Sequence, residues 1–349
     1  MKTGQTEQYD VLQIIRVFAA SMIILYHTDL IGGRGYFGVQ IFFVISGFLA
    51  FHSTRRPVSA GRYLLRRCIR LLPLYWIFTV LTFLVLTVRP GISNMSDEDP
   101  VHFLFSMLFI PFRGKAGAVL PILAVGWTMQ YEMAFTLLFS LSLLISHRHR
   151  ALICSLLLLG LTAVGLFLKP KPLFLKYYAS EHLIDFFLGL LSGYLWHRLR
   201  ASVPADRPVL SRLSGVSSVA VKVLLSALAL GSLAFLILDV KLPFRLHQAV
   251  RLGIPAAVLI FSLMLLLERV SFPRRLLSLC KMTYSVFLVE YFTTSVYKRL
   301  IPPSPGLVTA VLSLAVLFAV TFVLSAVPYR LIEVRLTSRL KRILLPSRA

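Results

Sequence analysis

Long apolar stretches recur from one end of this chain to the other. A transmembrane helix needs roughly 20 consecutive apolar residues, and ten stretches approach or exceed that length. They cover residues 11–30, 36–54, 71–88, 125–146, 151–168, 182–197, 215–240, 250–267, 276–297 and 306–329. With 57% hydrophobic residues and a mean hydropathy of +0.80, the chain lies outside the range of soluble domains. We therefore predict an all-α, polytopic integral membrane protein with about ten transmembrane helices.

The basic residues predict the orientation of these helices. The formal net charge of +23 is distributed over short clusters between the apolar stretches, and cytoplasmic loops of membrane proteins are rich in Lys and Arg. Placing both termini in the cytoplasm puts most of the basic residues on that side, including 55–70 and a basic cytoplasmic tail at 330–349. We expect a single domain over 1–349 that contacts membrane lipids and not nucleic acid.

One apolar segment, within residues 101–124, is too short to span. Its run VHFLFSMLFIPF has about half the length that a bilayer requires. A full span here would invert the orientation of everything that follows, which the basic residues at 147–150 argue against. The sequence therefore predicts a re-entrant or interfacial segment.

The stretch 11–30 carries two polar residues, Arg16 and His27, that are costly inside a membrane. Eleven residues in an α-helix come within about 20° of three full turns, so both side chains share a face, roughly 16 Å apart. His27 has two interpretations, a histidine hydrogen-bonded between helices or a general base, since histidine changes charge nearest to neutral pH. Arg16 on the same face makes the two interpretations about equal.

A basic cluster, Arg66, Arg67 and Arg70, precedes the third apolar stretch. Such clusters in cytoplasmic loops often reflect only topology and lipid contact. However, Arg67 and Arg70 are three residues apart and share a helix face. Guanidinium groups gathered in this way suit bidentate phosphate binding.

Glu132 lies near the outer end of the fourth apolar stretch, at the predicted depth of His27. An intramembrane carboxylate needs a partner. Glu132 is therefore either structural, in a buried salt bridge or a hydrogen bond to a neighbouring helix, or functional, orienting His27 or sharing its proton. Trp127 is either an interfacial anchor or a substrate contact.

Further candidates for substrate binding lie in other outer halves of the predicted spans, namely Asp185 and Glu290, with Tyr284 lower on the ninth stretch. The remaining His and Cys residues show no ligand spacing, so no metal is predicted. Gly38 and Gly47 indicate close packing of the second stretch against the first.

Taken in order, these elements resemble the acyltransferase-3 family of bacterial membrane O-acyltransferases. The resemblance rests on Arg16 and His27, GVQIFFVISGFL at 38–49, RRCIRLLPLYW at 66–76 and WTMQYE at 127–132, with looser matches at 185–195, 283–290 and 328–333. Within the family the chain is most similar to stand-alone exopolysaccharide or lipopolysaccharide O-acetyltransferases. One departure is Glu290, at a position where the family commonly has histidine.

The resemblance implies transfer of an acyl group, usually acetyl, from cytoplasmic acetyl-CoA or another acyl-CoA to a hydroxyl of a cell-envelope glycan or lipid-linked glycan. It implies that His27 is catalytic, with Arg16, Arg67, Arg70 and Glu132 as essential partners. We expect Arg67 and Arg70, with the neighbouring Arg66, to hold the phosphates of the donor and Arg16 to bind a phosphate or polar group further in. It also implies a bacterial inner membrane location and cooperation with polysaccharide-biosynthesis proteins. The sequence is compatible with an acetyl or a succinyl donor. His27 either acts as a base or takes the acyl group itself.

A different class of protein, a transporter or flippase for an anionic or lipid-linked substrate, would also need buried Arg, His and Glu side chains. Such proteins more often contain inverted repeats or broken helices, and the sequence has no clear internal repeat. They also have no particular need for a cytoplasmic arginine cluster.

Overall fold

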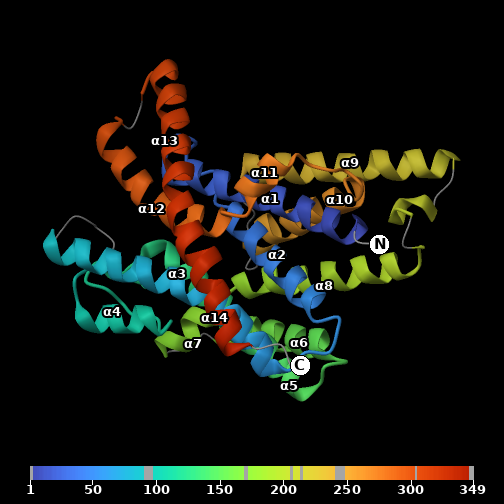
Figure 1. Ribbon diagram of the computed structural model, residues 1–349, viewed down its shortest axis with the longest axis horizontal. Coiled ribbons are helices and arrows are strands. Elements are labelled where there is room, and N and C mark those ends of the chain that lie inside the picture. Colours follow the sequence, from blue (N-terminus) through green and yellow to red (C-terminus); the bar gives the residue numbers. More distant parts are fainter. Residues whose placement is uncertain are drawn as a thin grey trace. The chain divides into compact units, whose positions relative to one another are not determined.

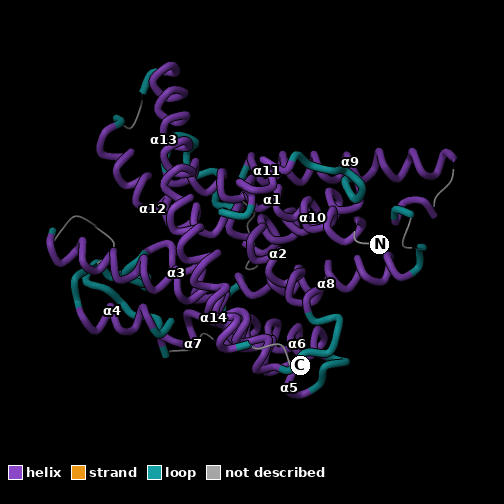
Figure 2. Tube along the Cα trace, in the orientation of Figure 1, coloured by secondary structure: helices purple, strands orange, loops and turns teal. Residues whose placement is uncertain are grey.

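The computed structural model describes residues 3–89, 97–168, 172–204, 207–212, 215–239, 248–302 and 305–345. Figures 1 and 2 show that helices make up the regular structure of these residues, whose one β-type pairing is an isolated bridge between Arg113 and Val119. The all-α prediction is therefore confirmed. The α-helices are α1 (Thr3–His27), α2 (Gly38–Ser53), α3 (Ala60–Val88), α4 (Pro100–Met107), α5 (Trp127–Ile145), α6 (Arg150–Ala163), α7 (Leu173–Tyr178), α8 (His182–Ala201), α9 (Gly215–Leu238), α10 (Ile254–Leu266), α11 (Arg274–Cys280), α12 (Thr283–Leu300), α13 (Leu307–Pro328) and α14 (Thr337–Leu344).

Short helices of other types continue or join these elements. Two are 3-10 helices, η1 (Ala124–Gly126) and η3 (Val209–Arg212). Three are π-helices, η2 (Val164–Leu168), η4 (Ala249–Gly253) and η5 (Tyr329–Leu336). Because π-helical turns are rare and frequently occur at functional sites, η4 is considered again below.

Within the described residues, seven helical stretches are long and apolar enough to cross a membrane. They are Asp10–His27, Ala60–Val88, Ala124–Ile145, Arg150–Leu168, Ser217–Leu238, Ala249–Leu266 and Leu307–Leu344. The three other predicted spans are also helical, but α2 has only 16 residues, and α8 and α12 carry charged residues that lower their hydropathy. The predicted count of about ten transmembrane helices is therefore not confirmed.

Helix α3 begins well before residue 71, where the apolar stretch starts. Pro57 precedes it in extended chain, and the Ser59 hydroxyl accepts a hydrogen bond from the Arg62 N–H at 3.4 Å. Serine is a favoured N-cap because it satisfies a backbone N–H that has no partner within the helix. The prediction of 55–70 as a connection is thus wrong from residue 60 onward, and the basic cluster stands on a helix.

The segment that follows α3 in the described chain, residues 97–124, contains only the short helix α4. Its eight residues extend about 12 Å, so the prediction that this segment does not span is confirmed. Its end is attached to α3: the Tyr75 hydroxyl donates to the Ser106 carbonyl at 2.9 Å, and Trp76 Nε1 donates to the Met107 carbonyl at 3.0 Å. The re-entrant position itself stays a prediction.

A buried carboxylate, Asp97, holds both ends of this segment. Its Oδ2 accepts from the Lys115 N–H at 2.7 Å, and its Oδ1 lies 2.8 Å from His102 Nδ1. The other ring nitrogen of His102 lies 2.8 Å from the Leu120 carbonyl. Burial alone would raise the pKa of Asp97, but the hydrogen bonds from Lys115 and His102 lower it below its usual value.

We expect Asp97→Asn to lower the free energy of unfolding at pH 7 by about 1–3 kcal/mol, because charge-assisted hydrogen bonds are lost. The pKa of Asp97 is lower in the folded state than its usual value of 3.8. The carboxylate therefore stabilises the fold above pH 3.8, and this stabilisation is lost as the pH falls through the folded-state pKa. The difference between variant and wild type should therefore vanish in acid. Unfolding midpoints at pH 7 and pH 3 measure this, with the exposed Glu98→Gln as the control; an equal difference at both pH values contradicts the assignment.

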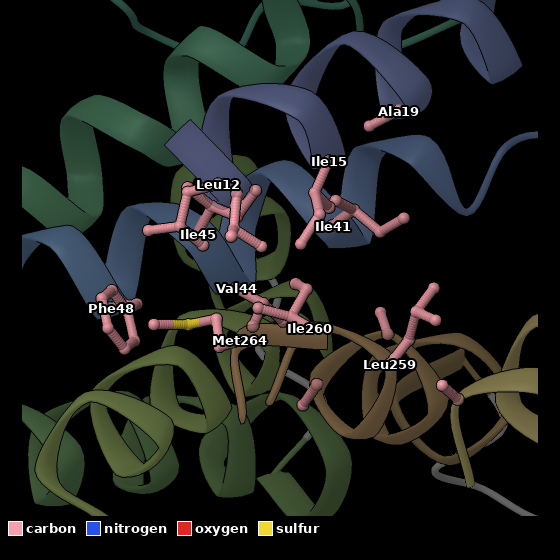
Figure 3. Packing of buried hydrophobic residues seen from close by; sticks show 14 of the residues in the cluster. Leu12, Ile15, Ala19, Ile41, Val44, Ile45, Phe48, Leu259, Ile260 and Met264 are labelled. Atoms are coloured by element: carbon pink, nitrogen blue, oxygen red, sulfur yellow. The ribbon is translucent and has the colours of Figure 1, made fainter. Parts of the chain in front are cut away.

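The chain divides into two compact units. Unit 1 comprises Met1–Arg56, Ile184–Tyr284 and Thr294–Leu317, and unit 2 comprises Pro57–Leu183, Ser285–Thr293 and Phe318–Ala349. Within unit 1, Figure 3 shows the apolar side chains of three helices packed together. They are Leu12, Ile15 and Ala19 of α1, Ile41, Val44, Ile45 and Phe48 of α2, and Leu259, Ile260 and Met264 of α10. The predicted single domain over the whole chain stays a prediction.

Two glycines of α2 allow neighbouring helices to approach its backbone. A Cβ at Gly38 would lie 2.4 Å from the Ala19 carbonyl oxygen of α1, as the predicted packing requires. A Cβ at Gly47 would lie 2.2 Å from the Phe186 carbonyl oxygen of α8, and Gly189 of α8 is equally close to the Val44 carbonyl. Gly38 therefore packs on the first helix as predicted, whereas Gly47 packs on α8, and small residues are what such close helix contacts need.

Gly47→Ala is expected to destabilise unit 1 by about 1–3 kcal/mol, because the new methyl group meets a backbone carbonyl that cannot rotate away. Gly231→Ala is the matched control, since Gly231 lies within α9 of the same unit and a Cβ there meets nothing within 4 Å. The control should be neutral or slightly stabilising, because alanine favours helix. Unfolding midpoints in detergent compare the two, and equal effects would contradict the close contact.

Candidate functional site

Arg16 and His27 occupy one strip along α1, which continues without a break between them. The strip runs through Ala20 and Ile23, at the helical spacing of four, three and four residues. Both intervening residues are buried, each with 2% of its surface exposed. Since the middle of the strip faces protein, Arg16 and His27 lie on a protein-facing side of the helix, as predicted.

The two ends of this strip differ in their surroundings. Arg16 is partly buried and its guanidinium lies over the Phe42 ring of α2, 5.9 Å from the centroid. His27 is also partly buried and is the last residue of α1, and its ring lies 5.1 Å from that of Tyr26, with the two planes tilted by 55°. The chain then leaves the helix through Asp29, whose φ of 62° lies in the left-handed region. A polar side chain at a helix end, beside a turn, is accessible to a ligand in a way that a mid-helix residue is not.

Unit 2 contains a buried ion pair between two predicted site residues. Arg67 Nη1 of α3 donates to Glu132 Oε1 of α5 at 3.0 Å, with side-chain exposures of 13% and 7%. The Arg67 guanidinium also lies over the Tyr63 ring, 5.7 Å from its centroid, and Tyr63 packs on Phe139 of α5. The pair thus joins α3 to α5 in a setting where removing either charge would leave the other uncompensated.

This contact corrects the predicted depths of the two residues. Arg67 was expected on the cytoplasmic side and Glu132 in the outer half of its span, but two atoms 3.0 Å apart share one depth. The prediction failed because α3 begins at Ala60 and carries Arg67 inside the helix. Arg66 and Arg70 differ from Arg67 in having exposed side chains. Of the two alternatives for Glu132, the structure shows the buried salt bridge.

Trp127 begins α5 and belongs to an aromatic cluster that the sequence analysis missed. Its ring lies 4.9 Å from His182 and 5.9 Å from Tyr131, and the Tyr131 hydroxyl donates to the Tyr177 carbonyl at 2.6 Å. The Tyr177 hydroxyl in turn donates to Gln130 Oε1 at 2.6 Å. The one signal in the sequence was the Tyr-Tyr pair at 177 and 178, just before His182.

The other predicted substrate-binding residues are buried on two helices, α8 and α12. Asp185 of α8 and Glu290 of α12 are each 1% exposed, and Tyr284, near the start of α12, is 6% exposed. Asp185 and Tyr284 belong to unit 1 and Glu290 to unit 2. Their assignment to substrate binding stays a prediction.

No group of three or more His, Cys, Asp or Glu side chains suited to a metal ion occurs among the residues that the structure describes. The candidate groups described above are an imidazole and a guanidinium in unit 1, and a carboxylate and three guanidinium groups in unit 2. An imidazole can accept a proton from a hydroxyl, and guanidinium groups bind phosphate.

Comparisons with known proteins show the class of protein to which the chain belongs. The sequence model of an acyltransferase family, described as an acyltransferase domain, matches residues 9–330. The exopolysaccharide production protein ExoZ of Rhizobium meliloti (strain 1021) is 31% identical over 169 residues, which are 48% of this chain and 52% of that protein. Nodulation protein 10 of Rhizobium leguminosarum bv. viciae is 28% identical over 233 residues, which are 56% of this chain and 62% of that protein.

The matched region spans about half to three fifths of the length of these curated relatives. No solved structure is significantly similar to the chain. The family match, by contrast, extends over nearly all the elements described above, from α1 to the start of η5. With its apolar helices and this match, the chain is a membrane protein and belongs to the acyltransferase family that the order of its motifs resembles.

Proposed function

We propose that the chain is a membrane O-acyltransferase that moves an acetyl group from acetyl-CoA to a hydroxyl of a cell-envelope polysaccharide or its lipid-linked precursor. Family membership supports acyl transfer. A relative named as an exopolysaccharide production protein supports a glycan acceptor. The proposed location is the bacterial inner membrane, with both termini cytoplasmic and polysaccharide-biosynthesis proteins as partners.

The observation that carries this proposal is the strip of α1 that ends in His27. Ala20 and Ile23, which separate Arg16 from His27, are apolar and buried, so the strip has a polar group at each end and apolar residues between them. A coenzyme A thioester has a similar layout, with phosphates at one end, a long arm and the reactive carbonyl at the other. Arg16 would hold a polar group of the donor while the thioester lies near His27.

The proposed reaction needs one proton acceptor and no redox partner. His27 takes the proton of the acceptor hydroxyl, whose oxygen attacks the thioester carbonyl. The new C–O bond forms, the C–S bond breaks, and the coenzyme A thiolate leaves and is protonated. In the alternative order His27 itself attacks the thioester and then passes the acyl group to the hydroxyl.

Binding of the donor phosphates is proposed for Arg66 and Arg70, whose side chains are exposed on α3. Arg67 is proposed to join them through the part of its guanidinium that Glu132 does not bind, since an arginine has five N–H donors in a fixed fork. Glu132 then acts as a positioning residue for Arg67. A role for Glu132 in orienting His27, and roles for Trp127, Tyr284 and Glu290 in binding the acceptor, stay predictions.

The decisive experiment reconstitutes the chain in lipid nanodiscs with acetyl-CoA labelled in the acetyl group. Deacylated oligosaccharides from the source strain's exopolysaccharide serve as acceptor, and succinyl-CoA is tested as a second donor. We expect alkali-labile label on the oligosaccharide, and the mass of the product identifies the acyl group. If no ester forms in nanodiscs, and closed lipid vesicles that contain the chain carry an unmodified glycan or lipid-linked glycan across their membrane, the chain is a transporter or flippase and the proposal is wrong.

A further inference from the structure

A pocket of about 380 Å³ lies within unit 1 at the end of α1. One wall is the turn after α1, where Gly32, Gly33 and Gly35 have φ angles of 62°, 76° and 102° that favour glycine. The opposite wall includes Asp239, just after α9, and Arg251 of η4. Pockets for small molecules in proteins hold about 300–1,000 Å³, so this one has room for a single small ring.

Two tyrosines give the pocket both apolar and polar surfaces. The rings of Tyr26 and Tyr36 line it, with centroids 5.5 Å apart and planes at 58°. Gln248 Nε2 donates to the Tyr36 hydroxyl at 3.4 Å. A tyrosine presents an apolar ring face and a hydrogen-bonding tip. A sugar ring is the complement of this pair, since it has C–H faces and a rim of hydroxyl groups.

Charged groups complete the lining. Arg251 Nη1 lies 3.2 Å from Asp239 Oδ1, and both side chains are partly exposed, 16% and 32%. Among the described residues, Arg251 Nε is buried and has no hydrogen-bond partner. Asp239 has a φ of 52°, a conformation that costs energy in a residue other than glycine and that often marks a binding site. An arginine and a carboxylate side by side can donate to and accept from adjacent hydroxyl groups.

Asp185 packs against the element that carries Arg251. Gly253 ends the π-helix η4, and a Cβ at this position would lie 2.2 Å from Asp185 Oδ1. The buried Asp185 carboxylate therefore packs directly against the η4 backbone. Asp185 thus lies against the element that carries Arg251, and its predicted role in substrate binding stays a prediction.

We propose that this pocket binds the sugar residue that receives the acyl group. Tyr26 lines the pocket and precedes His27 in the chain, and their ring centroids lie 5.1 Å apart, so the pocket lies beside the residue proposed as the base. Tyr26 and Tyr36 contact the faces of the ring, and Asp239 and Arg251 bind its hydroxyl groups. This assignment rests on the proposed function, which it deepens by placing the acceptor.

The test measures transfer in nanodiscs from labelled acetyl-CoA to the deacylated oligosaccharides, with each substrate varied in turn. Asp239→Asn and Tyr36→Phe are expected to raise KM for the oligosaccharide about 10-fold or more, while KM for acetyl-CoA stays unchanged. Tyr36→Phe removes only one hydroxyl and should leave the fold intact. It therefore keeps the test valid if the Asp239→Asn variant misfolds. Asp29→Asn is the matched control, because Asp29 follows α1 but pairs with Lys298 outside the pocket lining.

The outcomes separate the two proposals. If the wild-type chain transfers no acyl group, the proposed function fails and the acceptor assignment falls with it. If the wild type transfers the group and both pocket variants keep the wild-type KM for the oligosaccharide, only the pocket assignment fails. A rise in KM for both substrates in the Tyr36→Phe variant would indicate a general distortion and would likewise overturn it.

Discussion

Replacing His27 by alanine is expected to lower the rate of acyl transfer about 10²- to 10⁴-fold, the range that a positioned general base contributes. The reason is that the imidazole proposed to take the proton of the acceptor hydroxyl is lost from the end of α1, where the strip through Ala20 and Ile23 ends. Binding of acetyl-CoA should be little changed, since Arg16 and the α3 arginines are intact. Initial rates of labelled ester formation in nanodiscs measure the loss, and equilibrium binding of acetyl-CoA measures the donor affinity.

His149→Ala is the matched control, because His149 is an exposed histidine between α5 and α6. Its rate should equal that of the wild type. Incubation of the wild type with labelled donor alone distinguishes the two orders of reaction, because a trapped acyl-histidine requires direct attack by His27. A His27→Ala variant that transfers as fast as the control would show that neither order applies.

The parts of the fold that the sequence predicted depend on local patterns. Continuous apolar runs specify helices, so the all-α class and the position of α1 follow from hydropathy alone. The shared face of Arg16 and His27 follows from helix geometry once the helix is continuous. The short 101–124 segment was likewise excluded as a span by its length.

The errors arise where a polar segment continues a helix. Pro57 and Ser59 are helix-start signals ahead of the basic cluster, but a prediction based on apolar length places the start at residue 71. The same effect explains why the predicted ten spans and the seven apolar helical stretches differ, because α8 and α12 combine apolar faces with charged residues. Hydropathy measures how apolar a helix is, not where its hydrogen bonds begin and end.

The contacts that define the candidate sites depend on residues far apart in the sequence. The partners Arg67 and Glu132 lie on different helices, and the pocket wall combines α1, the end of α9 and η4. No local pattern specifies such a pairing. The sequence could therefore nominate Arg67, Glu132 and His27 as unusual residues within apolar surroundings, but it could not show that the first two bind each other.

The largest effect on stability is expected at the Arg67–Glu132 pair. Arg67→Met and Glu132→Leu should each lower the free energy of unfolding by about 3–5 kcal/mol, because each leaves a buried charge without its partner. The double variant should recover most of this loss, since apolar side chains of similar volume can replace a buried ion pair. Unfolding midpoints and slopes in detergent, measured for the four proteins of this cycle, give the interaction energy.

The same cycle tests whether the pair serves only the fold. If Arg67 also binds the donor, the double variant regains stability but still binds acetyl-CoA more weakly than the wild type. The exposed pair of Lys115 and Glu98, with atoms 2.8 Å apart, provides the control, and Lys115→Met should change neither quantity because exposed pairs contribute little. Full recovery of both donor affinity and stability in the double variant would show that Arg67 has only a structural role. Arg66 and Arg70 would then bind the donor phosphates without Arg67.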